Sequence, residues 1–171
     1  MALALELGLD RAADEAVRRA WAALERQGIE SLVSHIPSIR PHLTLVVSED
    51  ADGLRACAGE LRSRIGALPV ELVGPGLFAA DPAILYLSVA PTAALLDLHA
   101  RVAAAVADAG VELWPHYLPG EWVPHCTLSM GVTRERLGDA IAACLDQPLP
   151  IPAGLRDARL TDSLTGATSP L

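Results

Sequence analysis

A short motif occurs twice in this chain, and it constrains the fold more than any other feature. The run Pro-His-Leu-Thr-Leu at residues 41–45 recurs as Pro-His-Cys-Thr-Leu at residues 124–128, with a change only at the third position. Successive side chains of a β-strand point to opposite faces, so the histidine and threonine of each copy share one face and the apolar residues share the other. The repeat predicts two similar halves, each presenting an imidazole beside a hydroxyl. The four polar residues are His42, Thr44, His125 and Thr127.

Hydrophobic periodicity and turn residues predict alternating strands and helices around the two copies. Strands are expected at residues 3–9, 42–47, 70–73, 76–78, 84–89, 125–130 and 155–160, and helices at residues 10–27, 52–65, 92–109 and 133–145. No glycine-rich phosphate-binding fingerprint follows any of these strands, which argues against a Rossmann fold. Each half instead has the order helix, loop, strand, helix, as in an α+β protein built from two similar lobes.

The basic residues restrict the chemistry, because all 13 of them are arginines and the chain has neither lysine nor asparagine. P-loop proteins, Schiff-base enzymes and Ser-Lys hydrolases need a lysine, and a Cys-His-Asn triad or an N-glycosylation site needs an asparagine, so all of these are excluded. The net charge of −8 argues against a protein that binds long nucleic acid along its phosphates. Any nucleic-acid role is therefore local, on one phosphodiester or one strand end.

The cysteines and the hydropathy pattern predict a soluble protein of a reducing compartment, and we expect it in the cytoplasm. Cys57, Cys126 and Cys144 are odd in number and show no Cys-x-x-Cys spacing, which fits neither a disulfide scaffold nor a zinc ribbon. The N-terminus lacks a basic region and reaches Glu6 too early for a signal peptide. Charged residues interrupt the most hydrophobic long window, residues 83–109, so no membrane partner is expected.

Two histidines on equivalent strands suit acid–base catalysis without a metal or other cofactor. If the halves pair about an approximate two-fold axis, the four polar residues of the repeat face one another across a cleft. A neutral histidine can remove a proton from water or a hydroxyl, while a protonated one delivers a proton to the leaving oxygen. The threonine hydroxyls can donate to non-bridging phosphoryl oxygens, where charge accumulates in the transition state. The combination suits a phosphodiester whose nucleophile or leaving group is an alcohol.

Two His-x-Thr strand motifs at this separation resemble the 2H phosphoesterase superfamily, which includes 2′-5′ RNA ligases and cyclic phosphodiesterases. The resemblance implies one bilobal α+β domain over residues 1–171, with two pseudo-symmetric lobes, antiparallel sheets lining a central cleft and helices outside. The polar tail, residues 161–171, is a candidate for disorder. The substrate implied is a small nucleotide or RNA-terminus phosphodiester, such as a 2′,3′-cyclic phosphate, ADP-ribose cyclic phosphate or a 2′-5′ linkage. The catalytic residues implied are His42, Thr44, His125 and Thr127.

Three further residues are candidates for substrate binding. Arg40 is the cation closest in sequence to either motif histidine, and a guanidinium suits a phosphate. Tyr117 and Trp122 lie on the loop that leads into the second motif, where aromatic rings are well placed to stack on a base. Trp114 belongs to the same loop, and the three rings could instead form a small core between the lobes. In the bacterial RNA ligases that the motifs resemble, an arginine usually stands where this chain has Met130.

Other interpretations of the same residues stay open at this point. The two motif histidines could be structural, or the fold could bind nucleotides or RNA ends without catalysing a reaction. A metal-dependent hydrolase would draw its ligands from His35, His42, His116 and His125, although no carboxylate or thiol falls at ligand spacing near them. His99 is expected to pack in a helix. The sequence does not choose among the phosphodiesters named above, between hydrolysis and ligation, or between oligomeric states.

Overall fold

The computed structural model describes residues 2–171, without the side chains at positions 58, 63 and 64. Its strands form one antiparallel sheet in the order β2–β1–β6–β3–β4–β5, with β7 paired to β6. The strands are β1 (Leu3–Leu9), β2 (His42–Ser48), β3 (Leu68–Phe78), β4 (Ala83–Val89), β5 (His125–Val132), β6 (Ile151–Asp162) and β7 (Thr168–Pro170). The helices are α1 (Arg11–Arg26), α2 (Leu32–His35), α3 (Ala51–Arg64), α4 (Ala93–Asp108) and α5 (Leu137–Leu145), with 3-10 turns η1 (Pro115–Tyr117) and η2 (Arg134–Arg136).

The chain repeats one folding pattern in a pseudo-two-fold arrangement. The order β1–α1–α2–β2–α3–β3 of the first half matches the order β4–α4–η1–β5–α5–β6 of the second. Strands β3 and β6, the last of each half, pair with each other at the centre of the sheet. The strand order therefore reads the same from either end when the halves are exchanged. The two motif strands, β2 and β5, take equivalent places at its opposite edges.

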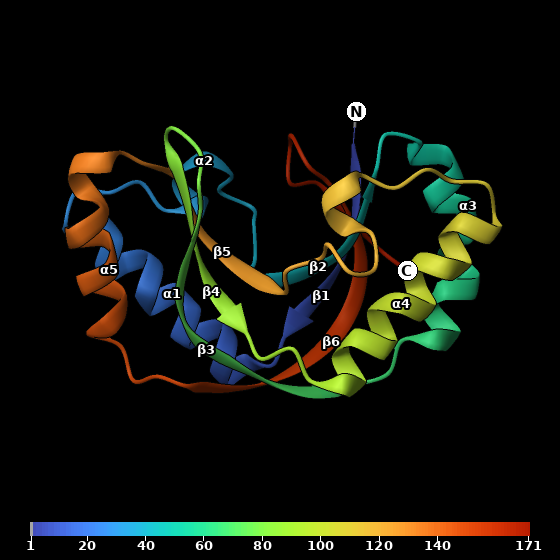
Figure 1. The fold of residues 1–171 in the computed structure, drawn as a ribbon, viewed down its shortest axis with the longest axis horizontal. Coiled ribbons are helices and arrows are strands. Elements are labelled where there is room, and N and C mark those ends of the chain that lie inside the picture. The colour runs from blue at the N-terminus through green and yellow to red at the C-terminus, as the bar shows by residue number, and fades with distance from the viewer. Residues whose placement is uncertain (1) are drawn as a thin grey trace.

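The helices form two pairs, and each pair combines the two halves of the chain. Figure 1 shows α1 and α5 together on one side of the molecule and α3 and α4 together on the other, with the strands between them. Helix α1 follows β1 in sequence but also contacts β5, whereas α4 follows β4 but contacts β2. Each motif strand is therefore supported by a helix from the opposite half of the chain.

One apolar core holds the helices on the sheet. The leucines that alternate along β1 (residues 3–9) are buried and join this core. Helix α1 adds the buried stripe that its three- and four-residue spacing predicts. Asp10 caps its N-terminus, because its carboxylate accepts a hydrogen bond from the backbone N–H of Ala13. The residues between the leucines, Ala4 and Glu6, face the other side of the sheet and line a cavity.

The predicted α+β fold with pseudo-symmetric lobes is confirmed, and several element boundaries are corrected. The strands expected at residues 70–73 and 76–78 are one strand, β3, because the Gly-Pro pair between them stays in the ladder with β4. Strand β6 is longer than expected because it pairs with both β1 and β3. The tail that was a candidate for disorder ends β6 and supplies β7. The helix expected from residue 133 begins as η2 and becomes α-helical at Leu137.

None of the helices in the described part of the chain is both long enough and apolar enough to span a bilayer.

A matched pair of buried serines ties each motif strand to the other half. The hydroxyl of Ser48 at the end of β2 donates to the carbonyl of Glu112, and the hydroxyl of Ser129 in β5 donates to the carbonyl of Glu30, each at 2.6 Å. Glu112 lies in the segment that leads to β5, and Glu30 in the segment that leads to β2. Each motif strand thus fixes the loop through which the chain enters its counterpart.

We expect Ser48→Ala and Ser129→Ala each to lower the free energy of unfolding by about 1–3 kcal/mol, because each leaves a loop carbonyl without its buried donor. Urea unfolding measures the change. The control is Ser169→Ala on the exposed strand β7, which we expect to shift stability by no more than about 0.5 kcal/mol. If both buried variants behave like this control, the serines do not tie the halves together.

Candidate active site

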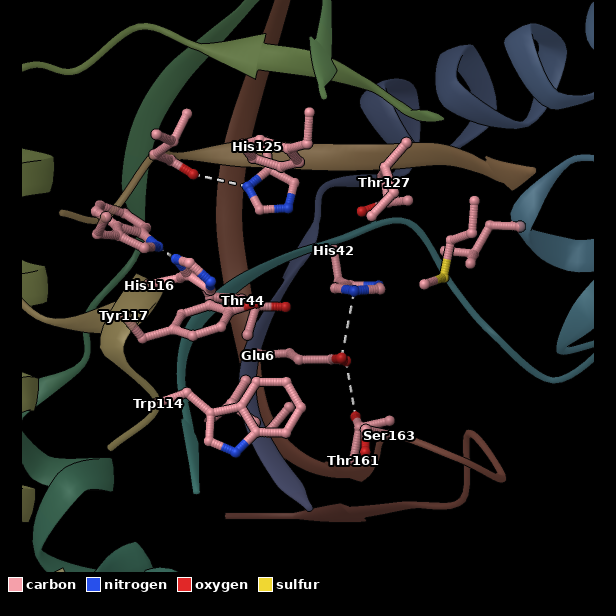
Figure 2. A pocket seen from close by; sticks show the side chains of 18 of the residues that line it. Glu6, His42, Thr44, Trp114, His116, Tyr117, His125, Thr127, Thr161 and Ser163 are labelled. Carbon is pink, nitrogen blue, oxygen red and sulfur yellow. Dashed lines mark hydrogen bonds and ion pairs between the residues drawn. The ribbon is translucent and has the colours of Figure 1, made fainter. Parts of the chain in front are cut away.

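The two motif strands face each other across a cavity of about 620 Å³. Strand β2 contributes His42 and Thr44 to its lining, and β5 contributes His125 and Thr127, as Figure 2 shows. These strands lie at opposite ends of the strand order but contact each other, so the sheet is strongly curved. The structure therefore brings together all four residues that the repeat singled out.

The two imidazoles are held in the same way. Nδ1 of His42 lies 2.7 Å from the carbonyl oxygen of Arg40, and Nδ1 of His125 lies 2.7 Å from the carbonyl oxygen of Val123. A carbonyl oxygen only accepts, so each Nδ1 carries a hydrogen and donates it. This contact two residues back along the chain fixes both ring orientations and leaves Nε2 as the nitrogen that can exchange a proton with a ligand.

Two tryptophans hold the motif threonines from the opposite half of the fold. Trp122 Nε1 donates to the carbonyl of Thr44 at 3.0 Å, and Trp21 Nε1 donates to the carbonyl of Thr127 at 3.3 Å. Edge strands carry backbone groups that lack a strand partner on one side, and here the indoles satisfy them. His99 stacks on Trp122 with ring centroids 4.0 Å apart, so this buried histidine packs against the support of the site.

His125 lies in an aromatic environment. Its ring meets Phe78 edge-on at 4.9 Å and lies 5.2 Å from Tyr86, and these two aromatic rings contact each other. A side chain at Gly76 would clash with the Tyr86 ring, so the glycine makes room for this group. Burial lowers the pKa of His125 below its ordinary value of 6.5, and the nearby His42 lowers it further, against the opposing effect of the Val123 carbonyl. These surroundings favour the neutral form of His125.

His42 has a carboxylate beside it instead. Its Nε2 lies 3.2 Å from Oε1 of Glu6, which is buried on β1. The other oxygen of that carboxylate, Oε2, accepts from the hydroxyl of Thr161 at 2.7 Å and from Nε of Arg159 at 3.3 Å. Figure 2 shows Glu6 between His42 and Thr161. The two histidines share backbone support but differ in their neighbours.

Glu6 and its partners were missed by the sequence reasoning, although one signal pointed to them. Glu6 is the one charged residue inside a strand whose other face is entirely leucine, and strand alternation puts it opposite those leucines. Its importance depends on β1 pairing with β2, which places Glu6 beside Thr44. The partners Arg159 and Thr161 come from β6, which reaches β1 only through the long-range pairing at the centre of the sheet.

The aromatic residues of the loop that leads into β5 differ in how far they are open to the cavity. Tyr117 and Trp122, the two candidates for stacking on a base, both line the cavity. Tyr117 hydrogen-bonds the side chain of Thr44, and burial raises the pKa of its phenol to about 12, so it stays neutral at physiological pH. Trp122 is buried behind Thr44. Trp114 lines the same cavity with 38% of its surface exposed, so its ring is the more open one for stacking.

The remaining candidates lie away from the cavity or at its margin. The side chain of Arg40 is exposed and absent from the cavity lining, so this residue contributes its carbonyl to His42 but no cation to the cleft. His116 lines the cavity, whereas His35 pairs with Glu30 at 3.4 Å outside it. Cys126 is buried behind the motif, and burial raises the pKa of its thiol to about 12. Among the described residues, no group of three or more His, Cys, Asp or Glu side chains is arranged to hold a metal ion.

Residues 10–165 match the sequence model of the 2′-5′ RNA ligase superfamily. The chain belongs to this superfamily. The match spans both His-x-Thr motifs and both helix pairs, and it confirms the resemblance to the 2H phosphoesterases that the motifs predict. No curated protein matches the chain by sequence.

Solved structures share the fold of this chain. Escherichia coli LigT in its apo form and a protein described as a phosphoesterase each superpose with a TM-score of 0.59 at 16% identity, over 99% of this chain and 94% of theirs. Kluyveromyces marxianus Usb1 with uridine monophosphate superposes with a TM-score of 0.50 at 17% identity, over 99% of this chain and 97% of its own. This superfamily member therefore has the LigT-like fold over its whole described length.

The environment of His125 predicts its titration. Because burial disfavours the imidazolium, the midpoint in an NMR titration of the unliganded protein falls below pH 6.5, and the ring is neutral above it. The signal is assigned by its loss in His125→Ala. A midpoint above pH 6.5 would show that the aromatic surroundings do not desolvate this ring as described.

Proposed function

We propose that this superfamily member is a metal-independent phosphoesterase that hydrolyses, or reversibly forms, a cyclic phosphodiester or 2′-linked ester of a nucleotide or RNA end. The observation that carries the proposal is the placement of His42 and His125 on facing strands of one cavity, each with Nδ1 engaged by a backbone carbonyl. Two imidazoles that both offer Nε2 to the same space can serve one phosphorus centre as base and acid.

The reaction proceeds by proton transfer at the two Nε2 atoms. In hydrolysis, water attacks phosphorus while a neutral imidazole removes its proton, and a new P–O bond forms. The bond from phosphorus to the ribose oxygen breaks, and the protonated imidazole delivers its proton to that oxygen. The products are a phosphomonoester and an alcohol. Ligation follows the same steps in reverse.

The hydroxyls of Thr44 and Thr127 are placed to stabilise the transition state. Each shares a strand face with its histidine and lines the cavity. Hydroxyl donors aimed at the non-bridging oxygens stabilise the charge that develops there. Thr44 is held twice, by Trp122 at its carbonyl and by Tyr117 at its side chain, which fixes the donor before substrate arrives.

The cavity suits a small substrate with few negative charges. Its volume lies within the range of small-molecule sites. No arginine side chain is among the described residues that line it, and its wall carries the carboxylates of Glu6, Glu121 and Asp162. A chain of phosphates would find little attraction there, consistent with the net charge of −8. One phosphodiester, at the end of an RNA or in a nucleotide, fits better.

A nucleobase has an aromatic surface to bind. Trp114, Tyr117 and Phe78 line the cavity near the motifs, and stacking on such rings contributes about 1–3 kcal/mol per base. The Usb1 structure contains uridine monophosphate, which shows that a relative of the same fold takes a nucleotide. We extend that class of ligand to this chain. The three free, buried cysteines fit a reducing compartment such as the cytoplasm.

A turnover assay with a panel of phosphodiesters tests the proposal. The panel contains 2′,3′-cyclic nucleotides, ADP-ribose cyclic phosphate and 2′-5′ dinucleotides, and we expect the wild type to cleave at least one of them in the presence of EDTA. His42→Ala and His125→Ala should each lower kcat by about 10²–10⁴-fold, the contribution of one general acid or base. Loss of activity in EDTA would instead indicate a metal-dependent hydrolase.

The control variant is His35→Ala, which removes an imidazole outside the cavity and should keep the wild-type rate. Circular dichroism checks that each variant is folded. Titration with a nucleoside 2′-phosphate separates the enzyme from a binding module, because a module binds the phosphate but turns over none of the panel. Normal rates in both motif variants would also contradict the proposal.

A further inference from the structure

The two halves differ at one pair of equivalent positions next to the motif strands. Glu6 of β1 pairs with Thr44 of β2, and at the corresponding place Tyr86 of β4 pairs with Thr127 of β5. The first half thus sets a carboxylate beside its histidine where the second half sets an aromatic ring. The backbone carbonyls hold the two imidazoles in the same way. The two histidines therefore differ chemically through the side chains beside them, Glu6 in one half and Tyr86 in the other.

Each ring nitrogen of His42 has an oxygen atom nearby, but in a different kind of contact. Nδ1 donates to the carbonyl oxygen of Arg40 at 2.7 Å, and Nε2 faces Oε1 of Glu6 at 3.2 Å. An ionised carboxylate has no hydrogen to give, so at this distance it attracts a protonated ring and repels the lone pair of an unprotonated Nε2. The contact is an ion pair when His42 carries a hydrogen on both nitrogens.

The other contacts of Glu6 suit a carboxylate rather than a carboxylic acid. Thr161 and Arg159 both donate to Oε2, and a cation beside a carboxylate favours its ionised form. Nη2 of Arg159 is buried with no hydrogen-bond partner in the described part of the chain, and Glu6 is the carboxylate that pairs with this guanidinium. These contacts also orient the carboxylate, since they hold Oε2 and leave Oε1 directed at His42.

His125 has the opposite arrangement. Its Nδ1 donates to Val123, while Phe78 and Tyr86 surround its ring. Desolvation and the neighbouring His42 both lower the pKa of His125, so its Nε2 presents a lone pair. The polar groups near His42 come from four elements and from the cavity wall; they are Glu6 (β1), Arg159 and Thr161 (β6), His125 (β5), Tyr117 (η1), and the wall residues Glu121, Asp162 and His116.

We propose that Glu6 is a positioning residue that keeps His42 protonated, so that His42 is the general acid and His125 the general base of the reaction. This assignment rests on the proposed function. In the hydrolytic direction, water loses its proton to Nε2 of His125, and the leaving ribose oxygen takes the proton from Nε2 of His42. Glu6, held by Arg159 and Thr161, then faces a neutral His42 and favours its reprotonation from solvent.

The first test needs no substrate. In the full-length, unliganded protein labelled with ¹⁵N, the imidazole signals at pH 7 should show both nitrogens of His42 protonated but only one nitrogen of His125 protonated. Glu6→Gln replaces the carboxylate by an amide of the same shape, and we expect His42 to become mostly singly protonated in this variant. A neutral His42 in the wild type, or a doubly protonated His42 in Glu6→Gln, would overturn the proposal.

Two matched variants separate this effect from a general loss of charge or packing. Glu121→Gln removes an exposed carboxylate that lines the same cavity, whereas Glu6 is the carboxylate that pairs with His42, so His42 should stay doubly protonated in this variant. Thr161→Val removes the hydroxyl that orients Glu6, and we expect an intermediate loss of the doubly protonated form, which Thr161→Ser should restore. Equal losses in Glu6→Gln and Glu121→Gln would show a general charge effect and would also overturn the proposal.

Kinetics then test the division of roles. On a diester with a ribose leaving group, we expect Glu6→Gln to lower kcat by about 10²-fold, and the alkaline fall of its pH profile should begin at lower pH because the acid is lost sooner. On a nucleoside p-nitrophenyl diester the leaving group needs little protonation, so His42→Ala and Glu6→Gln should lose far less, whereas His125→Ala should lose as much as before. Equal losses on both substrates in His42→Ala would contradict the assignment. If the wild type turns over neither substrate, the proposed function fails while the protonation result stands by itself.

Discussion

The antiparallel pairing of β3 with β6 is the interaction on which the rest of the molecule depends. It joins the last strands of the two halves at the centre of one sheet, so that β2 and β5 take equivalent places at its two edges. The curvature of the sheet then brings its edge strands β2 and β5 into contact around the cavity. Without this central pair, the two His-x-Thr motifs would be two unrelated edge strands.

Contacts between the halves make the site rigid. Trp21 and Trp122 bind the backbone of the motif strand in the opposite half, and Ser48 and Ser129 tie each motif strand to the loop that leads into the other. Long-range hydrogen bonds of this kind hold the histidines at a fixed separation before any ligand binds. Such preorganisation is what a reaction with little covalent chemistry for the protein to perform requires.

The sequence predicted the parts of the site that local pattern determines. The repeat identified His42 and His125, and strand alternation placed Cys126 on the buried side of β5. It did not predict the network of Glu6, Arg159 and Thr161, because that network forms only when β1 lies between β2 and β6. A single charged residue on a leucine-rich strand has no visible partner until the topology is known.

Proximity in sequence was also a poor guide to proximity in space. Arg40 lies two residues before His42, but alternation and the loop direct its side chain to solvent, while its carbonyl orients the ring. Trp122 was a candidate either for stacking on a base or for a small core between the lobes; its ring stacks on His99, and its N–H donates to the carbonyl of Thr44. Aromatic residues on a loop beside a site can therefore hydrogen-bond the backbone of the site instead of stacking on a substrate.

The repeated backbone makes the two histidines alike in orientation, and the side chains next to them make the two differ in environment. The backbone repeat gives both histidines the same orientation, and the residues at the equivalent positions 6 and 86 give them different surroundings. A duplicated fold starts with two identical groups, whereas general acid–base catalysis needs one proton donor and one acceptor at the same pH. In the mechanism that we propose, a carboxylate beside one ring and aromatic burial around the other supply that difference.

The most direct measurement of the central claim is a crystal structure with a nucleoside vanadate, whose five-coordinate oxyanion resembles the transition state of phosphodiester cleavage. We predict that the vanadate lies in the cavity with its apical oxygens within hydrogen-bond distance of Nε2 of His42 and Nε2 of His125, and its equatorial oxygens near the hydroxyls of Thr44 and Thr127. Vanadate bound elsewhere on the protein, or bound to only one of the two histidines, would contradict the account.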